Sequence, residues 1–341
     1  MKERAASLTG KAADKMLITT FHSACVRFLK NRMMLLGYKR GNFVIYDTDE
    51  QKKIIRTIFE ETGFQGRYPD IRVYDVISFI SKQKEKMLGP DELESIYPDY
   101  PLITVYKEYE RILKKNNALD FDDLLWKTVQ LFENYPHILH SYQEQFKYIM
   151  VDEYQDTNLV QFKIISMLAD KYQNLCVVGD DDQSIYSFRG ADIRNILEFE
   201  KEFQNTKVIK LEENYRSTKN FLSAANAVIS HNQERKEKKL WTQGEEGNKL
   251  RTITLPDATT EAKFIVSEIE RMHNREKADY KDFAILYRTN AQSRLFEQCL
   301  TMKDIPYRLV GALSFFERKE VKDMLAYLCV LINPDDDFGL E

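Results

Sequence analysis

The stretch YIMVDEYQDTN, from Tyr148 to Asn158, decides the fold class of this 341-residue chain. Apolar and aromatic residues run directly into two adjacent carboxylates, Asp152 and Glu153, and a third acid, Asp156, follows. A short apolar run of this kind is typical of a buried strand, and a carboxylate at its end can bind Mg²⁺ or orient an attacking water. Acids at strand ends also act as helix caps, so the pair alone leaves both interpretations open.

Four other short apolar runs also end in polar residues, and we predict that each is a strand: 16–20, 175–178, 208–211 and 283–287. Helical patterns lie between them. Continuous apolar strands that alternate with helices predict an α/β protein with parallel sheets covered on both faces. Because ligands bind beyond the carboxyl ends of such strands, we expect the polar clusters to form the functional site.

Residues 48–117 have a different pattern, with charged amphipathic segments broken by Gly89-Pro90. Asp47 or Thr48 is the expected cap of the first helix. We interpret this region as a helical insertion between strands of the first α/β domain.

Composition excludes several classes of protein. The chain is 43% hydrophobic and 30% charged, with a formal net charge of −4. We find no apolar run of membrane-spanning length and no apolar signal-peptide region, so we expect no membrane association. Four scattered cysteines without a CxxC pair favour a reducing cytosol and a cytoplasmic location over a disulfide framework or a zinc site. Basic patches at 1–40 and 235–239 suit a polyanion or a solvated helix face.

The stretch VVGDDDQSIYSFRGA (177–191) again runs from an apolar segment through glycine and acids to a glutamine. Gln183 could bond both an attacking water and a γ-phosphate. Aromatic residues interleaved with an arginine, Tyr186, Phe188 and Arg189, suit stacking on unpaired bases, although the two rings could instead belong to the core.

The stretch LEENYRST (211–218) carries Arg216, which could reach a phosphate, and Tyr215, which could stack on a nucleobase. The alternative is an ordinary helix N-terminus capped by Ser217 or Thr218.

In this order, the three motifs resemble motifs II, III and IV of superfamily 1A DNA helicases of the UvrD/PcrA/Rep group. Four further segments are similar to the same group: TTFHSACVRFL (19–29), LDFDDLL (119–125), LYRTNAQSRLFE (286–297) and GALSFFERKEVKDMLAYLCVLINPDDD (311–337). RecB-type nuclease-helicases usually carry Pro-Lys where this chain has Asp181-Asp182, which favours the UvrD/PcrA/Rep group.

The resemblance implies ATP and Mg²⁺ as cofactors and assigns roles to individual residues. Asp152 would bind Mg²⁺, Glu153 would act as general base, and Gln183 would couple the γ-phosphate to DNA. Arg216 would contact the γ-phosphate, and Tyr215 would stack on adenine. The residues expected to contact DNA are Phe21, His22, Tyr186, Phe188, Arg189, Arg288 and Asn290. Some members have tryptophan at the position of Phe188, so we expect stacking that is retained but weaker.

The resemblance also implies two incomplete RecA-like units of the P-loop NTPase type. Domain 1A would comprise 1–47 and 118–207, the helical insertion 48–117 would be domain 1B, and 208–341 would be the first part of domain 2A. The sequence holds no G-x-x-x-x-G-K-[ST] motif, and the nearest string, ASLTGKAA, lacks its first glycine and its Ser/Thr. We therefore expect an internal piece of a longer helicase that also lacks motifs V and VI, with Leu340-Glu341 either native or a cloning remnant.

Three functions compete at this stage. The first is a part of a 3′–5′ helicase that moves along single-stranded DNA and acts at single-strand/double-strand junctions, together with repair or replication proteins. The isolated chain is then expected to be inactive as an ATPase and to hold no nucleotide. The second is a catalytically dead module that binds single-stranded DNA or a partner. The third, a different P-loop NTPase, does not explain the aromatic–arginine cluster at 186–189.

Overall fold

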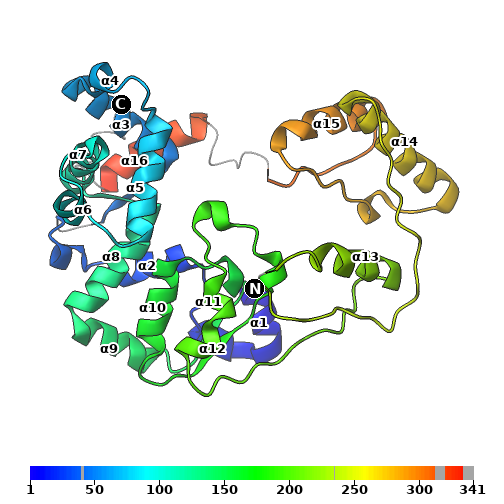
Figure 1. Ribbon diagram of the computed structural model, residues 1–341, viewed down its shortest axis with the longest axis horizontal. Coiled ribbons are helices and arrows are strands. Elements are labelled where there is room, and N and C mark those ends of the chain that lie inside the picture. Colours follow the sequence, from blue (N-terminus) through cyan, green and yellow to red (C-terminus); the bar gives the residue numbers. More distant parts are fainter. Residues whose placement is uncertain (40–41, 234, 312–318, 333–341) are drawn as a thin grey trace. The chain divides into compact units, whose positions relative to one another are not determined.

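The computed structural model describes residues 1–39, 42–233, 235–311 and 319–332. The chain divides into two compact units, each described below by itself (Figure 1). Unit 1 comprises Met1–Glu212, Asn226–Leu240 and Ala326–Glu341, and unit 2 comprises Glu213–Ala225 and Trp241–Leu325. None of the helices in these described stretches combines the length and apolar character needed to cross a membrane.

The strand that precedes the acid pair is β3, Ile149–Val151, and it pairs in parallel with β4, Leu175–Val177. Helix α10, Leu159–Ala169, forms the crossover between them, as a parallel pair requires. Asn158 caps this helix by accepting a hydrogen bond from the Gln161 amide at 2.9 Å. The register sets Val151 opposite Val177, so the loops that follow both strands leave the same edge of the sheet. These two strands confirm the prediction at 148–151 and 175–178.

Helices α2, Phe21–Leu29, α8, Phe121–Asn134, and α9, Pro136–Gln145, pack with α10 around one apolar cluster (Figure 1). Phe28 and Phe132 are buried there, with ring centroids 5.6 Å apart. A smaller cluster beside β3 is built from Val151, Tyr154, Ile165 and Phe199. The acid pair therefore follows a strand that is fixed by packed side chains.

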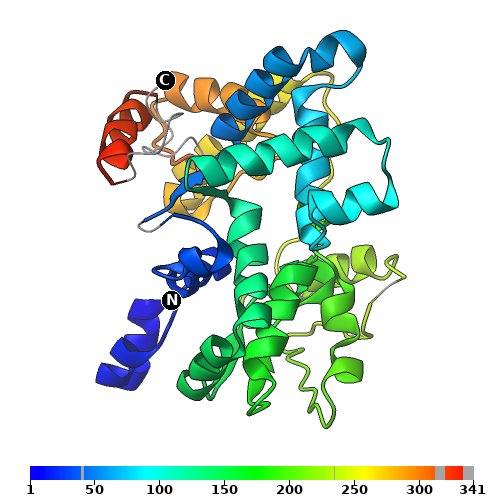
Figure 2. The same cartoon turned by 90° about the vertical axis from the view of Figure 1, so that its left-hand side faces the viewer.

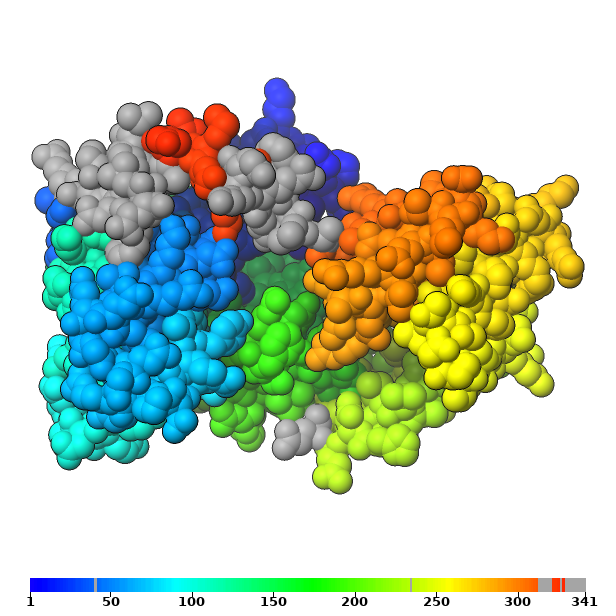
Figure 3. Space-filling view, turned by 90° about the horizontal axis from the view of Figure 1, so that it is seen from above, coloured from blue at the N-terminus to red at the C-terminus, as the bar shows by residue number. Residues whose placement is uncertain are grey.

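The helical insertion is flanked by a second parallel pair that the sequence did not reveal, β1, Val44–Tyr46, and β2, Ala118–Asp120. Its helices are α3 (Thr48–Thr62), α4 (Phe64–Arg67), α5 (Val73–Glu85), α6 (Pro90–Ile96) and α7 (Pro101–Lys115). Asp47, rather than Thr48, caps α3, because its carboxylate accepts from the Asp49 and Glu50 amides. The blue to cyan helices gather into one mass in Figures 2 and 3, around a core of their own. The predicted helical character of this region is confirmed.

Unit 1 also holds short elements that carry its loops. They are α1 (Lys2–Thr9), α11 (Arg194–Leu197), α12 (Phe199–Glu202) and the 3-10 helices η1 (Gly10–Lys15), η2 (Met33–Leu36), η3 (Tyr154–Asp156), η4 (Asp181–Gln183) and η5 (Ser187–Arg189). Gly10 and Lys11 lie in η1, directly after α1 and without a preceding strand, so the structure agrees that ASLTGKAA is no phosphate-binding loop.

Unit 2 is mainly helical. It contains α14 (Ala258–Glu276), α15 (Ser293–Met302), η6 (Tyr280–Asp282) and η7 (Asn290–Gln292), while α13 (Lys219–Ile229) and α16 (Lys319–Ile332) each cross a unit boundary. Val266, Leu300 and Ile305 form its small core. Part of the helicase-like segment 311–337 lies outside the described residues.

The strands predicted at 16–20, 208–211 and 283–287 are wrong, because the structure assigns no strand there. A strand exists only where a neighbouring segment completes its hydrogen bonds. Among the described residues, the one pairing outside the four strands is an isolated parallel bridge between Glu213 and Trp241. An apolar run reports burial but not the presence of such a neighbour.

Candidate functional site

The acid pair lies where the sequence places it, at the carboxyl end of β3. Asp152 and Glu153 are both exposed, and the Asp152 carboxylate accepts a hydrogen bond from the Glu153 amide at 3.1 Å. Glu153 has a φ of 51°, in the left-handed region that residues with a Cβ rarely adopt. Such a conformation costs about 1 kcal/mol or more and persists only where the surroundings impose it. The backbone thus turns the Glu153 side chain out of the strand direction.

Asp156 closes the short helix η3 beside the pair. Burial, followed by the nearby Glu153 carboxylate, raises the pKa of Asp156. Its Oδ1 atom is buried and makes no hydrogen bond with the described part of the chain. The turn that follows the acid pair therefore holds a buried carboxylate oxygen without a donor among the described residues.

The loop after β4 carries the predicted glutamine. Gln183 is exposed, and its Nε2 donates to Asp180 Oδ2 at 2.6 Å. Asp180 also caps η4, since its Oδ1 accepts from the Asp182 amide at 3.1 Å. The Asp180 backbone amide in turn donates to Gln155 Oε1 at 3.0 Å. The acid-pair loop and the glutamine loop are thus joined through Gln155, a residue that the sequence analysis missed although it lies within DEYQD.

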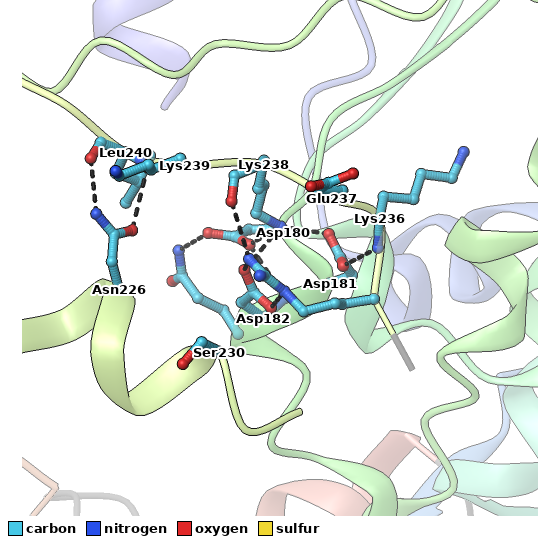
Figure 4. Close-up of polar contacts among 12 residues, drawn as sticks. Asp180, Asp181, Asp182, Asn226, Ser230, Lys236, Glu237, Lys238, Lys239 and Leu240 are labelled. Atoms are coloured by element: carbon cyan, nitrogen blue, oxygen red, sulfur yellow. Dashed lines mark hydrogen bonds and ion pairs between the residues drawn. The ribbon is translucent and has the colours of Figure 1, made fainter. Parts of the chain in front are cut away.

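Three consecutive aspartates in this loop surround one ammonium group. Lys238 Nζ lies 2.6 Å from Asp180 Oδ1 and 3.2 Å from Asp182 Oδ2, and it also contacts Asp181. Figure 4 shows the three aspartates facing the extended segment that carries Lys236 and Lys238. Burial disfavours the charged form of Lys238, but the hydrogen bonds that its ammonium group donates to Asp180 and Asp181 outweigh burial and raise the pKa of Lys238.

Arg235 completes this ion network. Its Nε and Nη2 donate to the two carboxylate oxygens of Asp182 at 2.9 and 2.7 Å, the paired geometry that binds arginine most firmly to a carboxylate. The Lys236 amide donates to Asp181 Oδ2 at 2.8 Å. The basic patch at 235–239 is therefore neither a helix face nor a bare polyanion site, because two of its cations are committed to the aspartates. The charges of this patch can be read from the sequence, but their partners in the aspartate loop cannot.

The aromatic–arginine cluster follows the same loop. Tyr186 and Phe188 are exposed, with ring centroids 5.9 Å apart. The Arg189 guanidinium carbon lies 5.3 Å from the Tyr186 ring and 5.5 Å from the Phe188 ring. Phe188 is 69% exposed, so the alternative that these rings belong to the core is wrong. Exposed rings beside a cation are a suitable surface for stacked bases.

The two residues predicted near the start of the chain lie at the first turn of α2, which Thr20 caps. Phe21 is half-buried and packs against both apolar clusters around the sheet. His22 meets the edge of the Phe121 ring at 5.7 Å, and burial lowers the pKa of His22. Phe21 therefore contributes to packing whatever else it contacts.

Unit 2 carries the remaining predicted residues. Tyr215 and Arg216 are exposed, and the Tyr215 hydroxyl donates to Glu213 Oε2 at 2.7 Å. Asn214 Oδ1 accepts from the Arg216 and Ser217 amides at 2.9 and 2.8 Å, so an asparagine holds the turn before α13. The cap at Ser217 or Thr218 stays a prediction.

A second exposed loop of unit 2 holds Arg288 and Asn290. Gln292 Oε1 accepts from the Arg288 and Thr289 amides at 2.9 Å each, which fixes the backbone while the Arg288 side chain stays exposed. The structure therefore brings Asp152, Glu153 and Gln183 together in unit 1 and places Tyr215, Arg216, Arg288 and Asn290 in unit 2.

Two family models match the chain. Residues 1–204 match the UvrD/REP helicase N-terminal domain, and residues 209–341 match the UvrD-like helicase C-terminal domain. The chain belongs to the UvrD/REP family of superfamily 1 helicases. The expected RecA-like α/β class is confirmed with it.

Similar members of this helicase family are bacterial. The chain is 46% identical over 342 residues to the ATP-dependent DNA helicase PcrA of Bacillus subtilis, covering 99% of this chain and 46% of the relative. It is 46% identical to PcrA of Staphylococcus epidermidis and 45% identical to PcrA of Staphylococcus aureus, covering 100% of this chain and 47% of each relative. The chain thus spans about half the length of the curated relatives it matches.

Proposed function

We propose that this chain is part of an ATP-dependent 3′–5′ DNA helicase that moves along single-stranded DNA and acts at its junctions with duplex DNA. One observation carries the proposal. The acid pair and the glutamine loop follow two paired parallel strands of one unit and are joined by hydrogen bonds, and the exposed aromatic–arginine cluster follows the glutamine loop directly in the chain. A nucleotide-hydrolysing site that is physically connected to a base-stacking surface is what a DNA motor requires.

Two carboxylates of the acid-pair loop have the chemistry of Mg²⁺ ligands, although the described residues form no cluster of three or more metal-ligating side chains. Asp152 offers an exposed carboxylate at a strand end, and Asp156 holds a buried oxygen that lacks a donor within the described residues. Oxygen ligands of this kind are the ones that Mg²⁺ takes in phosphate sites, where the ion neutralises charge on the phosphates. In our proposal Asp152 holds the ion, Glu153 accepts the proton of the attacking water, and Gln183 senses the γ-phosphate.

In unit 2, we propose that Arg216 contacts the γ-phosphate and that Tyr215 stacks on adenine. Both side chains are exposed, and the hydrogen bonds of Asn214 fix the backbone that carries Arg216. The single-stranded DNA path would comprise Phe21, His22, Tyr186, Phe188, Arg189, Arg288 and Asn290. Repair or replication proteins are the partners that such a motor would serve.

We further propose that the isolated chain does not hydrolyse ATP at a meaningful rate, because it contains no phosphate-binding P-loop. The test is an ATPase assay with and without single-stranded DNA on repurified chain. Hydrolysis that is stimulated by DNA, survives repurification and is lost in Glu153→Gln would refute this.

A catalytically dead module that binds single-stranded DNA, or a partner, is the second candidate, favoured by the exposure of Phe188 and Tyr186. Fluorescence anisotropy with a labelled oligonucleotide tests it. Tyr186→Ala should weaken binding by about 1–3 kcal/mol, and Tyr97→Ala, an exposed tyrosine in the helical insertion, is the matched control. Binding that is insensitive to salt and equal in the two variants would exclude contact through this cluster.

A further inference from the structure

Gln155 is buried between the two loops that end β3 and β4. Its side chain is 1% exposed, in the short helix η3. Its Nε2 donates to Glu153 Oε2 at 2.9 Å, and its Oε1 accepts from the Asp180 amide at 3.0 Å. The Gln155 backbone oxygen also accepts from the Ser184 hydroxyl at 3.3 Å. The Gln155 side chain thus bonds the start of the glutamine loop and one oxygen of Glu153, while the Gln155 backbone carbonyl bonds Ser184 further along that loop.

Chemistry fixes the orientation of this amide. A backbone N–H can only donate, so the side-chain oxygen must face Asp180. The NH₂ group must then face Glu153, whose carboxylate can only accept. Both ends are satisfied in one orientation and neither is satisfied in the flipped one. The link between Glu153 and Asp180 is therefore directional, and no other neutral side chain of this length supplies a donor and an acceptor so placed.

Gly179 leaves the space that this link needs. A Cβ atom at Gly179 would lie 2.6 Å from Gln155 Oε1 and 2.8 Å from Ile196 Cδ1, both inside contact distance. Glycine is needed here because a larger residue would clash, and not because of backbone conformation, since Gly179 has no positive φ. The backbone before Asp180 therefore lies too close to Gln155 for a Cβ to fit unless a neighbouring side chain moves.

The link continues from Asp180 to Gln183 through the hydrogen bond at 2.6 Å between Gln183 Nε2 and Asp180 Oδ2. Burial opposes ionisation of Asp180, but hydrogen bonds from Lys238 and Gln183 outweigh it and lower the pKa of Asp180. Asp180 therefore stays an acceptor near neutral pH. Glu153, Gln155, Asp180 and Gln183 form one unbroken series of hydrogen bonds.

We propose that Gln155 is a positioning residue that couples Glu153 to the loop of Gln183. By holding Oε2 of Glu153, Gln155 leaves Oε1 as the oxygen that faces a water. A shift of Asp180 would move the Gln155 side chain, and with it the Nε2 donor that holds Glu153. This inference rests on the proposed function for the roles of Glu153 and Gln183, but the link itself belongs to the folded chain.

The experiment is NMR of the chain in three variants. Gln155→Met removes both hydrogen bonds, whereas Gln155→Glu keeps the acceptor for the Asp180 amide and removes the donor to Glu153. Gln143→Met is the control, because Gln143 is also a buried glutamine of unit 1 and donates to the Met167 carbonyl at 2.8 Å. All three are compared by the hydrogen exchange of the Asp180 amide.

We expect exchange of the Asp180 amide to accelerate about tenfold or more in Gln155→Met and to stay slow in Gln155→Glu and in the control. The second readout is coupling: Glu153→Gln should shift the Asp180 and Gln183 resonances in the parent chain and not in Gln155→Met. Equal exchange in all variants, or shifts that persist without Gln155, would overturn the proposal. Neither readout uses ATP or DNA. The NMR result therefore tests the link through Gln155 even if the proposed helicase function is wrong.

Discussion

Replacement of Lys84 by methionine should strongly destabilise unit 1. Lys84 is fully buried, and its Nζ lies 2.7 Å from Glu110, 2.8 Å from Asp120 and 2.8 Å from Asp123. The four groups come from α5, α7, β2 and the start of α8. They tie the helical insertion to the segment LDFDDLL.

The expected loss in the free energy of unfolding follows from the contacts that remain after Lys84 is replaced. Methionine fills nearly the same volume, so little packing is lost. Two buried carboxylates, Asp120 and Asp123, lose their common cation, whereas the partly buried Glu110 keeps Lys127 at 3.6 Å. Asp120 also keeps hydrogen bonds from the Tyr109 hydroxyl at 2.9 Å and the Asp123 amide at 2.8 Å. Removing one partner of a buried ion pair costs about 3–5 kcal/mol, and we expect that range at pH 8.

The loss of stability caused by Lys84→Met should be smaller at acidic pH. Without Lys84, the folded state keeps protons on these carboxylates that the unfolded state releases, so the free energy of unfolding of the variant falls as pH rises. At pH 5 protonation removes part of the repulsion, and the difference from the parent should narrow by about 1 kcal/mol or more.

Urea unfolding followed by tryptophan fluorescence measures this. The chain has two tryptophans, so a Trp241→Phe background leaves buried Trp126 of α8 as the reporter of unit 1. Lys82→Met, on the exposed face of the same helix, is the control and should change stability by less than about 0.5 kcal/mol. A Lys84→Met variant within about 1 kcal/mol of that control at pH 8 would show that the buried charges do not stabilise the fold.

Three further outcomes are expected. Lys238→Met should lower stability by about 1–2 kcal/mol and speed amide exchange in residues 180–183, whereas Lys239→Met, which is exposed, should do neither; equal effects in hydrogen-exchange mass spectrometry would count against the ion network. Phe188→Trp should tighten single-stranded DNA binding about threefold in anisotropy, and unchanged affinity would argue against stacking at this ring. Burial and the Asp120 and Glu110 carboxylates raise the pKa of Asp123 to about 8, so its contribution to the free energy of unfolding should fall as pH rises from about 4 to 8. Asp123→Asn should therefore flatten the pH dependence of stability measured by urea unfolding. A pH dependence as steep as that of the parent chain would contradict this.

The sequence predicted those parts of the fold that depend on local pattern. The β3 strand and its acid pair follow from an apolar run that meets carboxylates, and the helices of 48–117 follow from their periodicity. The strand at 283–287 was predicted by the same reasoning and is absent, because strand formation depends on a partner that may be distant in the chain.

In the candidate site, too, features set by the local sequence were predictable and features set by distant residues were not. The interleaving of Tyr186 and Phe188 with Arg189 favours an exposed stacking cluster, whereas the pairing of Arg235 with Asp182 joins residues 53 positions apart and leaves no trace in the local sequence. Gln155 was overlooked because a glutamine in an exposed-looking motif gives no sign that it is buried. Buried polar networks are specified by three-dimensional proximity, which composition and periodicity do not encode.

Because Gly179 lies so close to Gln155, a small apolar substitution at this glycine can disturb the neighbouring site. Adding one methyl group at Gly179 introduces no charge and removes no catalytic group, yet it displaces the amide oxygen that holds the next loop. A Gly179→Ala variant would therefore behave in a screen as a defect of Glu153, although its origin is purely steric. The tolerance of this position to substitution reports the spacing between two loops rather than the chemistry of either.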